Sequence, residues 1–460
     1  MFNKILIANR GEIALRVIRA CQELGVSTVA VHSTADADTV PVSVADESVC
    51  IGPPQVTKSY LNMHAILTAA KLTGAEAIHP GYGFLAENET FARLVRNSGL
   101  VFIGPSADHI ARMGQKAEAR KTMKEAGLPI LPGSADMVKD GDEAKRIAAD
   151  IGYPVLLKAA YGGGGRGMRV VAKEEDLGPA FAQAAAEAMN AFGDGSLYLE
   201  KFIERPHHIE IQILADQRGG VVHLGERECS IQRRHQKLIE ESPSPFLARD
   251  RALQICETVR QAIARIGYEG AGTVELIVDE NRRFYFMEMN TRLQVEHPIT
   301  EEITGIDIVK EQIRIASGQP LRFRQDDVTF RGHSIECRAL AEDATLDFRP
   351  CTGTIQNLHF GLGPGIRVET HIYSGYQIPA TYDSLLAKFI SWGLTRAESI
   401  SRMRRAIRET VIEGLPTTLP WHSQVLVEPD FVRGTYTTHY VAEHRRLQDP
   451  APATGAGSGS

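Results

Sequence analysis

The first hundred residues alternate short apolar runs with amphipathic ones. Residues 4–8 are apolar after Lys4 and predict a buried strand. Apolar residues then recur at helical spacing up to Leu24, and Gly25 predicts the end of that helix. Further strands are predicted at residues 28–32, 77–80 and 101–104. The alternation predicts a parallel, doubly wound sheet, a fold that binds ligands at the carboxyl ends of its strands.

The pattern changes after residue 127. A stretch rich in Gly and Pro precedes a smaller predicted unit that ends near residue 202 and comprises a strand, a glycine-rich loop, an alanine-rich helix and a second strand (155–158, 161–167, 180–191 and 197–201). Ile209, Ile211 and Ile213 alternate with polar residues, which predicts antiparallel strands with one polar face. The last hundred residues mix strands and helices again. Their arginine cluster is interpreted as a solvated helix face and not as a binding patch (Arg402, Arg404, Arg405, Arg408).

Composition narrows the class of protein. With 460 residues and 43% hydrophobic residues, the chain can form a large core and about three domains. The formal net charge of −6 gives no argument for binding nucleic acid or membrane. There is no apolar run long enough for a transmembrane helix, and the N-terminus does not resemble a signal peptide. Six cysteines without a CxxC pair favour a reducing, cytoplasmic setting, and the tail 449–460 is expected to be disordered.

Residues 161–167 hold five glycines in seven positions. Their backbone N–H groups could closely approach a polyphosphate, and Lys158 at the end of the preceding strand could reach the same phosphates. The pattern is neither a P-loop nor a dinucleotide-binding motif. A plain flexible loop is the alternative interpretation.

Two glutamates stand on a predicted hairpin. If the turn is centred on Asn281 and Arg282, Glu275 lies opposite Glu288, with Cβ atoms about 5 Å apart. No Lys or Arg of the hairpin stands between them on that face, so the carboxylates would repel each other unless a divalent cation joined them. Mg²⁺ prefers such oxygen ligands, and Asn290 could be a third ligand. Two exposed edge glutamates are the alternative.

The next segment places Arg292, Gln294 and Glu296 at alternate positions, so an extended chain would project them to one side. His297 precedes a proline, which also favours extended backbone. Arginine offers two parallel donors to a small planar anion, and Glu296 could accept its proton. A charged strand face is the alternative. A dense run of hydrogen-bonding residues leads up to Lys237, and the pair of histidines at 207–208 is not expected to bind metal.

Five segments together resemble one family, the biotin carboxylases, which are the ATP-grasp components of biotin-dependent carboxylases. They are residues 8–14, 79–87, 162–168, 230–237 and 288–298, and the resemblance runs from Phe2 to about His444. It implies an α/β and α+β architecture. An N-terminal doubly wound domain would span 1–113, an ATP-grasp region 114–317 with a mobile lid at 131–203, and a C-terminal mixed domain with antiparallel sheet 333–444.

The resemblance also implies roles for individual residues. ATP would be held by Lys116, Lys158, Gly163, Gly164, Gly165, Glu200, Lys201, Ile203, His208, Gln232 and His235, together with the metal ligands. Mg²⁺ or Mn²⁺ would be bound by Glu275, Glu288 and Asn290. Bicarbonate would be held by Lys237, Arg292, Gln294 and Val295. Glu296 would deprotonate it, Arg338 would stabilise the biotin enolate, and Tyr82 would line the biotin side.

The implied activity is the ATP- and bicarbonate-dependent carboxylation of biotin through carboxyphosphate. The chain lacks the usual biotin-attachment motif, so the expected partners are a biotinylated carrier protein and carboxyltransferase subunits, with acetyl-CoA carboxylase and fatty acid biosynthesis as the expected context. A homodimer is implied, with Arg19 and Glu23 matching interface positions. Two alternatives remain open at this point: another ATP-grasp ligase that makes an acyl or carbamoyl phosphate, and a non-catalytic ATP-binding protein with a regulatory role.

Overall fold

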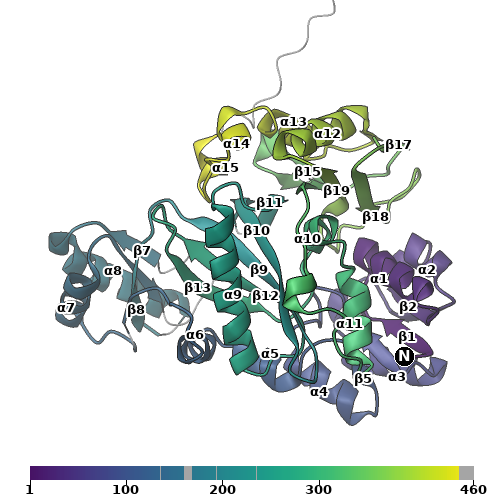
Figure 1. Cartoon of the computed structure of the whole chain (residues 1–460), viewed down its shortest axis with the longest axis horizontal. Helices are drawn as coiled ribbons and strands as arrows, with labels where there is room; N and C mark the ends of the chain where they lie inside the picture. Colours follow the sequence, from purple (N-terminus) through teal and green to yellow (C-terminus); the bar gives the residue numbers. More distant parts are fainter. Residues whose placement is uncertain (135, 160–167, 193, 235, 445–460) are drawn as a thin grey trace, which may run out of the picture. The chain divides into compact units, whose positions relative to one another are not determined.

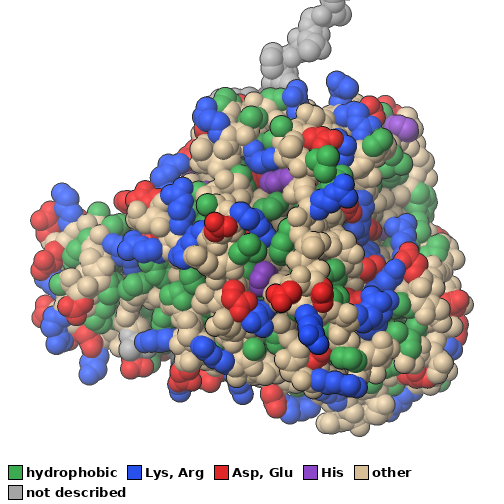
Figure 2. Space-filling view, viewed as in Figure 1, with side chains coloured by type: hydrophobic (Ala, Val, Ile, Leu, Met, Phe, Trp, Pro, Cys, Tyr) green, Lys and Arg blue, Asp and Glu red, His purple; other side chains and the backbone are tan. Residues whose placement is uncertain are grey.

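The computed structural model describes residues 1–134, 136–159, 168–192, 194–234 and 236–444 (Figure 1). The chain divides into two compact units. The first comprises Met1–Leu128, His207–Leu276 and Glu288–Ser460, and the second comprises Pro129–Pro206 and Ile277–Met287. Among the described residues, no helix is both long and apolar enough to span a membrane. In Figure 2, basic side chains are interspersed with acidic ones over the face in view, in keeping with the mild net charge.

The N-terminal part of the first unit is the predicted parallel sheet. Its strands are ordered β3-β2-β1-β4-β5, and every neighbouring pair is parallel. Three residues of β1, Ile5, Leu6 and Ile7, are completely buried, as the apolar run predicted. The strands are β1 (Lys4–Ile7), β2 (Ser27–Ser33), β3 (Glu47–Gly52), β4 (Ala77–His79) and β5 (Val101–Phe102). The helices are α1 (Gly11–Glu23), α2 (Val40–Val44), α3 (Met63–Thr73), α4 (Glu89–Asn97), α5 (Ala107–Gly114) and α6 (Lys116–Glu125).

A second, eight-stranded sheet has the order β13-β12-β9-β10-β11-β14-β19-β18. Its strands are β9 (His207–Ala215), β10 (Val221–Arg233), β11 (Gln236–Ser242), β12 (Gly270–Val278), β13 (Phe284–Asn290), β14 (His333–Leu340), β18 (Ile366–Thr370) and β19 (Leu385–Gly393). The antiparallel prediction is confirmed for β9 with β10. Glu210 and Gln212 alternate with the isoleucines and so share one face of β9, but the predicted half-burial is wrong, because every residue of β9 is buried. Helices α9 (Arg249–Arg265) and α11 (Ile308–Ala316) contact β9, and α10 (His297–Thr304) contacts β10.

The end of the described chain packs onto β14 and β19. Helix α12 buries Ile400, Met403 and Ile407 in a core that includes Phe389 and Trp421, so its polar face turns outward. The elements here are α12 (Arg396–Glu409), α13 (Leu419–Val425), α14 (Pro429–Arg433), α15 (Tyr440–Glu443), and the short strands β15 (Glu342–Asp343), β16 (Arg349–Pro350), β17 (Asn357–His359) and β20 (Val411–Glu413). The tail 449–460 lies outside the described residues.

The second unit is a small antiparallel sheet with two helices. Its strand order is β7-β6-β8, with β6 (Val155–Ala159), β7 (Met168–Val171) and β8 (Leu197–Lys201), and its helices are α7 (Gly141–Ile151) and α8 (Glu174–Phe192). The predicted strands and helix are confirmed, although the helix begins six residues earlier than the alanine-rich run. The core of the second unit contains small aliphatic residues such as Ala144, Ala148 and Val155. The glycine-rich loop 161–167 lies outside the described residues.

Candidate active site

Lys237 is the centre of a buried charge cluster in the first unit. The β10–β11 hairpin, in which Lys237 pairs with Gln232, positions it. Its Nζ donates to Glu296 Oε1 at 2.8 Å and to Glu275 Oε1 at 3.2 Å, and it also contacts Glu210. Burial alone would lower the pKa of this ammonium, but the three carboxylates raise its pKa well above the usual value. Lys237 is therefore charged and bound by acids from three separate segments.

His208 adds a second cation on β9. Its Nε2 lies 3.0 Å from Glu275 Oε2 and 3.4 Å from Glu210 Oε1. Burial favours the neutral ring, yet the two glutamates raise the pKa of His208 to about 9, so it is protonated at neutral pH. Burial likewise favours a neutral Glu275, but Lys237 and His208 hold the pKa of that carboxyl well below its usual range.

The surroundings of Glu275 differ in two respects from the predicted pair of facing glutamates. The hairpin itself supplies no cation, but Lys237 reaches Glu275 from a strand 38 positions away in sequence. The turn also differs from the prediction. Asp279 and Arg283 are joined by a backbone hydrogen bond of 2.9 Å, so the turn is centred on Asn281, half a residue earlier than predicted.

Glu288 and Asn290 complete the oxygen-rich group around Glu275. Asn290 Nδ2 donates to Glu275 Oε1 at 2.6 Å, and its Oδ1 accepts from Arg292 Nη2 at 3.0 Å. Burial and the negative charge of Glu275 raise the pKa of Glu288. A divalent cation would relieve both effects, and two carboxylates with an amide oxygen are ligands that Mg²⁺ accepts, so the residues fit the metal.

A second group of potential ligands shares Glu275 with the group above. Side-chain atoms of His208, Glu210 and Glu275 lie within 4.8 Å of one another, a spacing that could hold a metal ion. Lys237 contacts both Glu210 and Glu275, so its ammonium already supplies a positive charge to this group.

The segment after β13 is not extended, contrary to the prediction. The chain bends at Arg292, residues 295–296 form a turn, and His297 is the first residue of α10. Pro298 is accommodated because the first turn of a helix does not need the missing N–H. The side chains of Arg292 and Gln294 nevertheless contact each other. Arg292 Nη1 donates to Gln294 Oε1 at 3.0 Å, and Gln294 Nε2 donates to Glu275 Oε1 at 3.3 Å.

Glu296 is fully buried between two cations. Its Oε1 accepts from Lys237, and its Oε2 accepts from Arg338 Nη2 at 3.0 Å. Burial opposes ionisation of Glu296, but these cations lower its pKa. Arg338, on β14, also contacts Glu240 on β11, whose pKa burial raises to about 7. Glu296 is thus ionised and able to accept a proton.

Two cations with no exposed side-chain surface, Arg227 and Lys388, were not predicted from the sequence. Arg227 on β10 has no exposed surface and donates to Glu210 Oε2 at 3.1 Å. Lys388 on β19 is equally buried, lies 3.1 Å from Glu12 and donates to the carbonyl of Val295 at 2.8 Å. The only available signal was a charged residue in the middle of an otherwise buried strand.

The remaining predicted residues are placed as follows. Tyr82 donates to Glu12. Lys116 is the first residue of α6 and is exposed, and Gln232 Nε2 lies 3.4 Å from His208 Nδ1. In the second unit, Lys158 Nζ donates to Glu200 Oε2 at 2.6 Å.

Two further residues of the second unit belong to the predicted nucleotide site. Lys201 Nζ donates to the carbonyls of Gly152 and Tyr153, at 3.0 and 2.8 Å, and Ile203 follows β8. Gly163, Gly164, Gly165 and His235 lie outside the described residues.

Three family models match the chain. They are the biotin carboxylase N-terminal domain at residues 1–110, the ATP-binding domain of the carbamoyl-phosphate synthase L chain at 115–324, and the biotin carboxylase C-terminal domain at 336–443. The biotin carboxylase of Nostoc sp. is 53% identical over 442 residues, covering 96% of this chain and 99% of the relative. The chain belongs to the biotin carboxylase family. Biotin carboxylases are ATP-dependent ligases, and the matching N- and C-terminal domains disfavour the alternative of a different ATP-grasp ligase.

Other relatives show the range of this family. One, from the pyruvate carboxylase of Methanothermobacter thermautotrophicus, is 52% identical, covering 97% of this chain and 91% of that relative. Among solved structures, the biotin carboxylase domain of a thermophilic 2-oxoglutarate carboxylase bound to bicarbonate superposes with a TM-score of 0.94 at 50% identity, covering 98% of this chain and all of the other. A dimer of that domain from Hydrogenobacter thermophilus, in complex with MgADP and bicarbonate, has a TM-score of 0.89 at 52% identity, with the same coverage.

Proposed function

We propose that the chain carboxylates biotin on a separate carrier protein, using ATP and bicarbonate and passing through carboxyphosphate. The observation that carries the proposal is Glu296, a buried carboxylate kept ionised between Lys237 and Arg338. Solved relatives in complex with bicarbonate and with MgADP support the same substrates here.

The proposed first step is activation of bicarbonate. Lys237, Arg292 and Gln294 bind the anion, together with the backbone of Val295, whose carbonyl is fixed by Lys388. Glu296 accepts the bicarbonate proton, and the adjacent cations stabilise the negative charge that develops on oxygen.

Mg²⁺, or Mn²⁺, would be held by Glu275, Glu288 and Asn290. When bound, the metal would neutralise charge on the phosphates of ATP. The proposed nucleotide ligands of the chain are Lys116, Lys158, Glu200, Lys201, Ile203, His208 and Gln232, together with Gly163, Gly164, Gly165 and His235.

In the proposed second step, carboxyphosphate would break down to CO₂ and phosphate, the phosphate would take the proton from the biotin ureido nitrogen, and the resulting enolate would attack CO₂. Arg338 carries a positive charge, and its guanidinium would stabilise the enolate of the biotin ureido group, with Tyr82 lining the biotin side. In the structure Arg338 contacts Glu240 and Glu296, so a purely supporting role for this arginine is the competing hypothesis.

The test separates the two steps by measuring phosphate release and carboxybiotin in parallel. Glu296→Gln should lower both bicarbonate-dependent ATP hydrolysis and carboxybiotin about 10²–10⁴-fold, because the base is lost. Arg338→Gln should lower carboxybiotin far more than ATP hydrolysis. Glu302→Gln is the matched control, at a partly exposed position of α10, the helix that begins directly after Glu296.

Two results would contradict the proposal. Unchanged ATP hydrolysis in Glu296→Gln would remove the base from the mechanism. Equal loss of both products in Arg338→Gln would favour the purely supporting role of Arg338.

We further propose acetyl-CoA as the final acceptor of the assembled complex. The chain matches nearly the whole length of relatives named simply biotin carboxylase, such as that of Haemophilus influenzae, at 52% identity and 98% of its length. The complex with its native carrier and carboxyltransferase should be assayed with acetyl-CoA, propionyl-CoA, pyruvate and 2-oxoglutarate. A preference for either keto acid would overturn acetyl-CoA but leave the biotin half-reaction intact.

A homodimer is also proposed, by analogy with the dimeric relative. Arg19 and Glu23 do not pair with each other. Arg19 lies 3.7 Å from Glu369, Glu23 contacts Lys310, and the side chains of Arg19 and Glu23 are at least half exposed. Light scattering at micromolar concentration should give twice the chain mass of 50.4 kDa, and the monomer mass alone would refute the dimer.

A further inference from the structure

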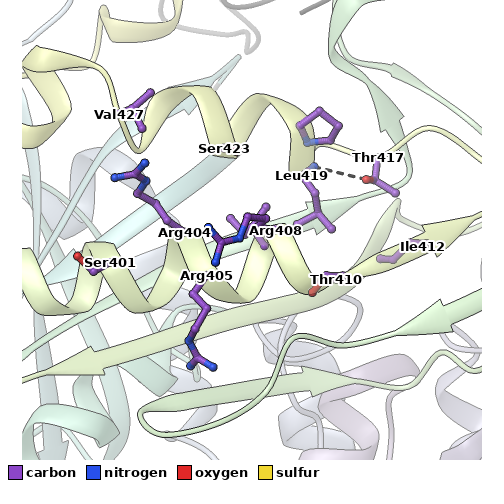
Figure 3. A pocket seen from close by; sticks show the side chains of 12 residues that line it. Ser401, Arg404, Arg405, Arg408, Thr410, Ile412, Thr417, Leu419, Ser423 and Val427 are labelled. Carbon is purple, nitrogen blue, oxygen red and sulfur yellow. Dashed lines mark hydrogen bonds between the residues drawn. The ribbon is translucent and has the colours of Figure 1, made fainter. Parts of the chain in front are cut away.

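The C-terminal part of the first unit holds a cavity that the carboxylation mechanism does not use. It lies along α12 and α13 and has a volume of about 590 Å³ (Figure 3). Small-molecule sites typically have volumes of about 300–1,000 Å³. None of the proposed carboxylation-site residues is among the described residues that line it. Three arginines line it (Arg404, Arg405, Arg408), and none of its described lining residues is an Asp or Glu.

The arginines of α12 fall into two classes. Arg402 donates to Glu398 and to the carbonyl of Trp392, and Arg405 donates to the carbonyl of Leu362 at 2.7 Å. These two arginines have partners within the chain. Figure 3 shows Arg405 pointing away from α13.

Arg404 and Arg408 form the second class and differ from Arg402 and Arg405. They are exposed, lie one helical turn apart and project toward α13, and neither has a hydrogen bond or ion pair to any residue that the structure describes (Figure 3). Like charges four residues apart on a helix destabilise it by about 0.2–0.5 kcal/mol. An anion between the two guanidinium groups would convert this repulsion into attraction.

The rest of the lining adds two further properties. Four hydroxyl side chains offer hydrogen bonds, among them Ser401 and Ser423, which stand on facing helices. Five apolar residues, including Ile407, Leu419 and Val427, form a surface that can bury a hydrocarbon or a ring. Guanidinium and hydroxyl donors together match the several oxygens of a phosphate group better than the two of a carboxylate.

We propose that this cavity binds a small phosphate ester that also carries an apolar group. The inference is independent of the proposed carboxylation chemistry, because no residue of that mechanism takes part. It also divides the arginine cluster, since Arg402 and Arg405 are half-buried and bound within the chain, whereas only Arg404 and Arg408 are exposed, as the predicted solvated face requires, and have no counter-charge among the described residues.

The experiment measures binding of 1-naphthyl phosphate to the full chain by calorimetry, with MgADP and bicarbonate at saturating concentration so that the carboxylation site is filled. One saturable site is expected. Arg404→Gln with Arg408→Gln should weaken binding at least about tenfold, because charge-assisted hydrogen bonds are lost. Lys58→Gln with Lys71→Gln, which removes the same charge at exposed positions elsewhere, should leave binding unchanged.

Two further arms define the ligand chemistry. 1-Naphthol should not bind, and 1-naphthoate should bind more weakly than the phosphate. Ser423→Trp, which fills the cavity without changing charge, should abolish binding while ATP hydrolysis stays normal. Absence of saturable binding, equal binding by the double arginine variant, or equal affinity for 1-naphthol would overturn the proposal.

Discussion

Lys237 lies in a nearly buried charge cluster, whereas Arg404 and Arg408 line an open cavity of the same unit. Lys237 is nearly buried and is bound by three carboxylates of its own chain. The two arginines are exposed, and no described residue neutralises them. An unpaired charge costs several kcal/mol when buried but little when solvated. The fold therefore supplies partners where water is excluded and can leave an exposed cation available to a ligand.

The carboxylates that bind Lys237 also bind other cations. Glu210 contacts Lys237, His208 and Arg227, and Glu296 contacts Lys237 and Arg338, so each of these two carboxylates has more than one cationic neighbour. Removing one member takes a partner from several others at once. We expect large, non-additive effects in this cluster and small, additive effects at the α12–α13 cavity.

The largest effect is expected for Lys237→Met. Three buried carboxylates lose their common cation, so the free energy of unfolding should fall by about 3–5 kcal/mol and bicarbonate-dependent ATP hydrolysis should be lost. Urea unfolding measures the free energy of unfolding, and phosphate release measures ATP hydrolysis. Lys310→Met is the control, because its pair with the exposed Glu23 should be worth at most about 1 kcal/mol. Equal losses in both variants would contradict the difference between buried and exposed pairs.

Glu241→Gln tests a buried carboxylate outside the active site. Arg396 donates to it at 2.7 Å and His333 at 2.5 Å. Burial favours the protonated form, but Arg396 and His333 lower its pKa to about 2, from an ordinary value of 4.5. The lowered pKa stabilises the fold above pH 4.5, and this stabilisation is lost as the pH falls toward 2.

We therefore expect Glu241→Gln to cost about 3 kcal/mol at pH 7, with the difference from the unchanged protein shrinking below about pH 4.5. Unfolding by urea at a series of pH values measures it. A difference that stays constant down to about pH 3 would show that the carboxylate charge is not what stabilises this site.

Glu288→Gln tests the proposed metal site with a smaller effect. Loss of one carboxylate ligand should raise the Mg²⁺ concentration needed for half-maximal ATP hydrolysis about 10- to 100-fold, as for other weakened metal sites. Glu280→Gln, in the exposed turn of the same hairpin, is the matched control. Coincident Mg²⁺ titrations for both variants would exclude Glu288 as a ligand.

The sequence predicts those parts of the fold that depend on local periodicity. The buried strand β1, the helix ending before Gly25 and the strand Leu197–Lys201 follow from apolar spacing and glycine, both of which act within a few residues. The burial of both faces of β9 could not be predicted in this way, because helices distant in sequence cover it.

In the candidate site, too, local sequence predicts some features, while others depend on contacts between distant parts of the chain. Residue types with metal-ligand or acid–base chemistry predict Glu275, Glu288 and Glu296, but not which cations compensate them. Lys237 meets Glu296 across 59 positions of sequence, and Arg338 meets it across 42. Such pairings arise only when the chain folds and the segment before α10 is brought against β11 and β14. Pro298 favours extended backbone at His297, but the start of α10 outweighs that local preference.

The smallest expected effect is a change in the free energy of unfolding, and its sign tests whether Arg404 lacks a partner, in contrast to Lys237. Arg404→Gln removes one of two like charges on adjacent turns of α12 and should raise the free energy of unfolding by up to about 0.5 kcal/mol at low salt. Arg402→Gln, on the same helix, removes bonds to Glu398 and to the Trp392 carbonyl, so it should lower stability by at most about 1 kcal/mol. Salt should reduce the Arg404 effect, because exposed charges are screened. Urea unfolding at low and high ionic strength measures both variants. A loss of stability in Arg404→Gln as large as that in Arg402→Gln would mean that Arg404 is already compensated within the chain, and the contrast with Lys237 would then fail.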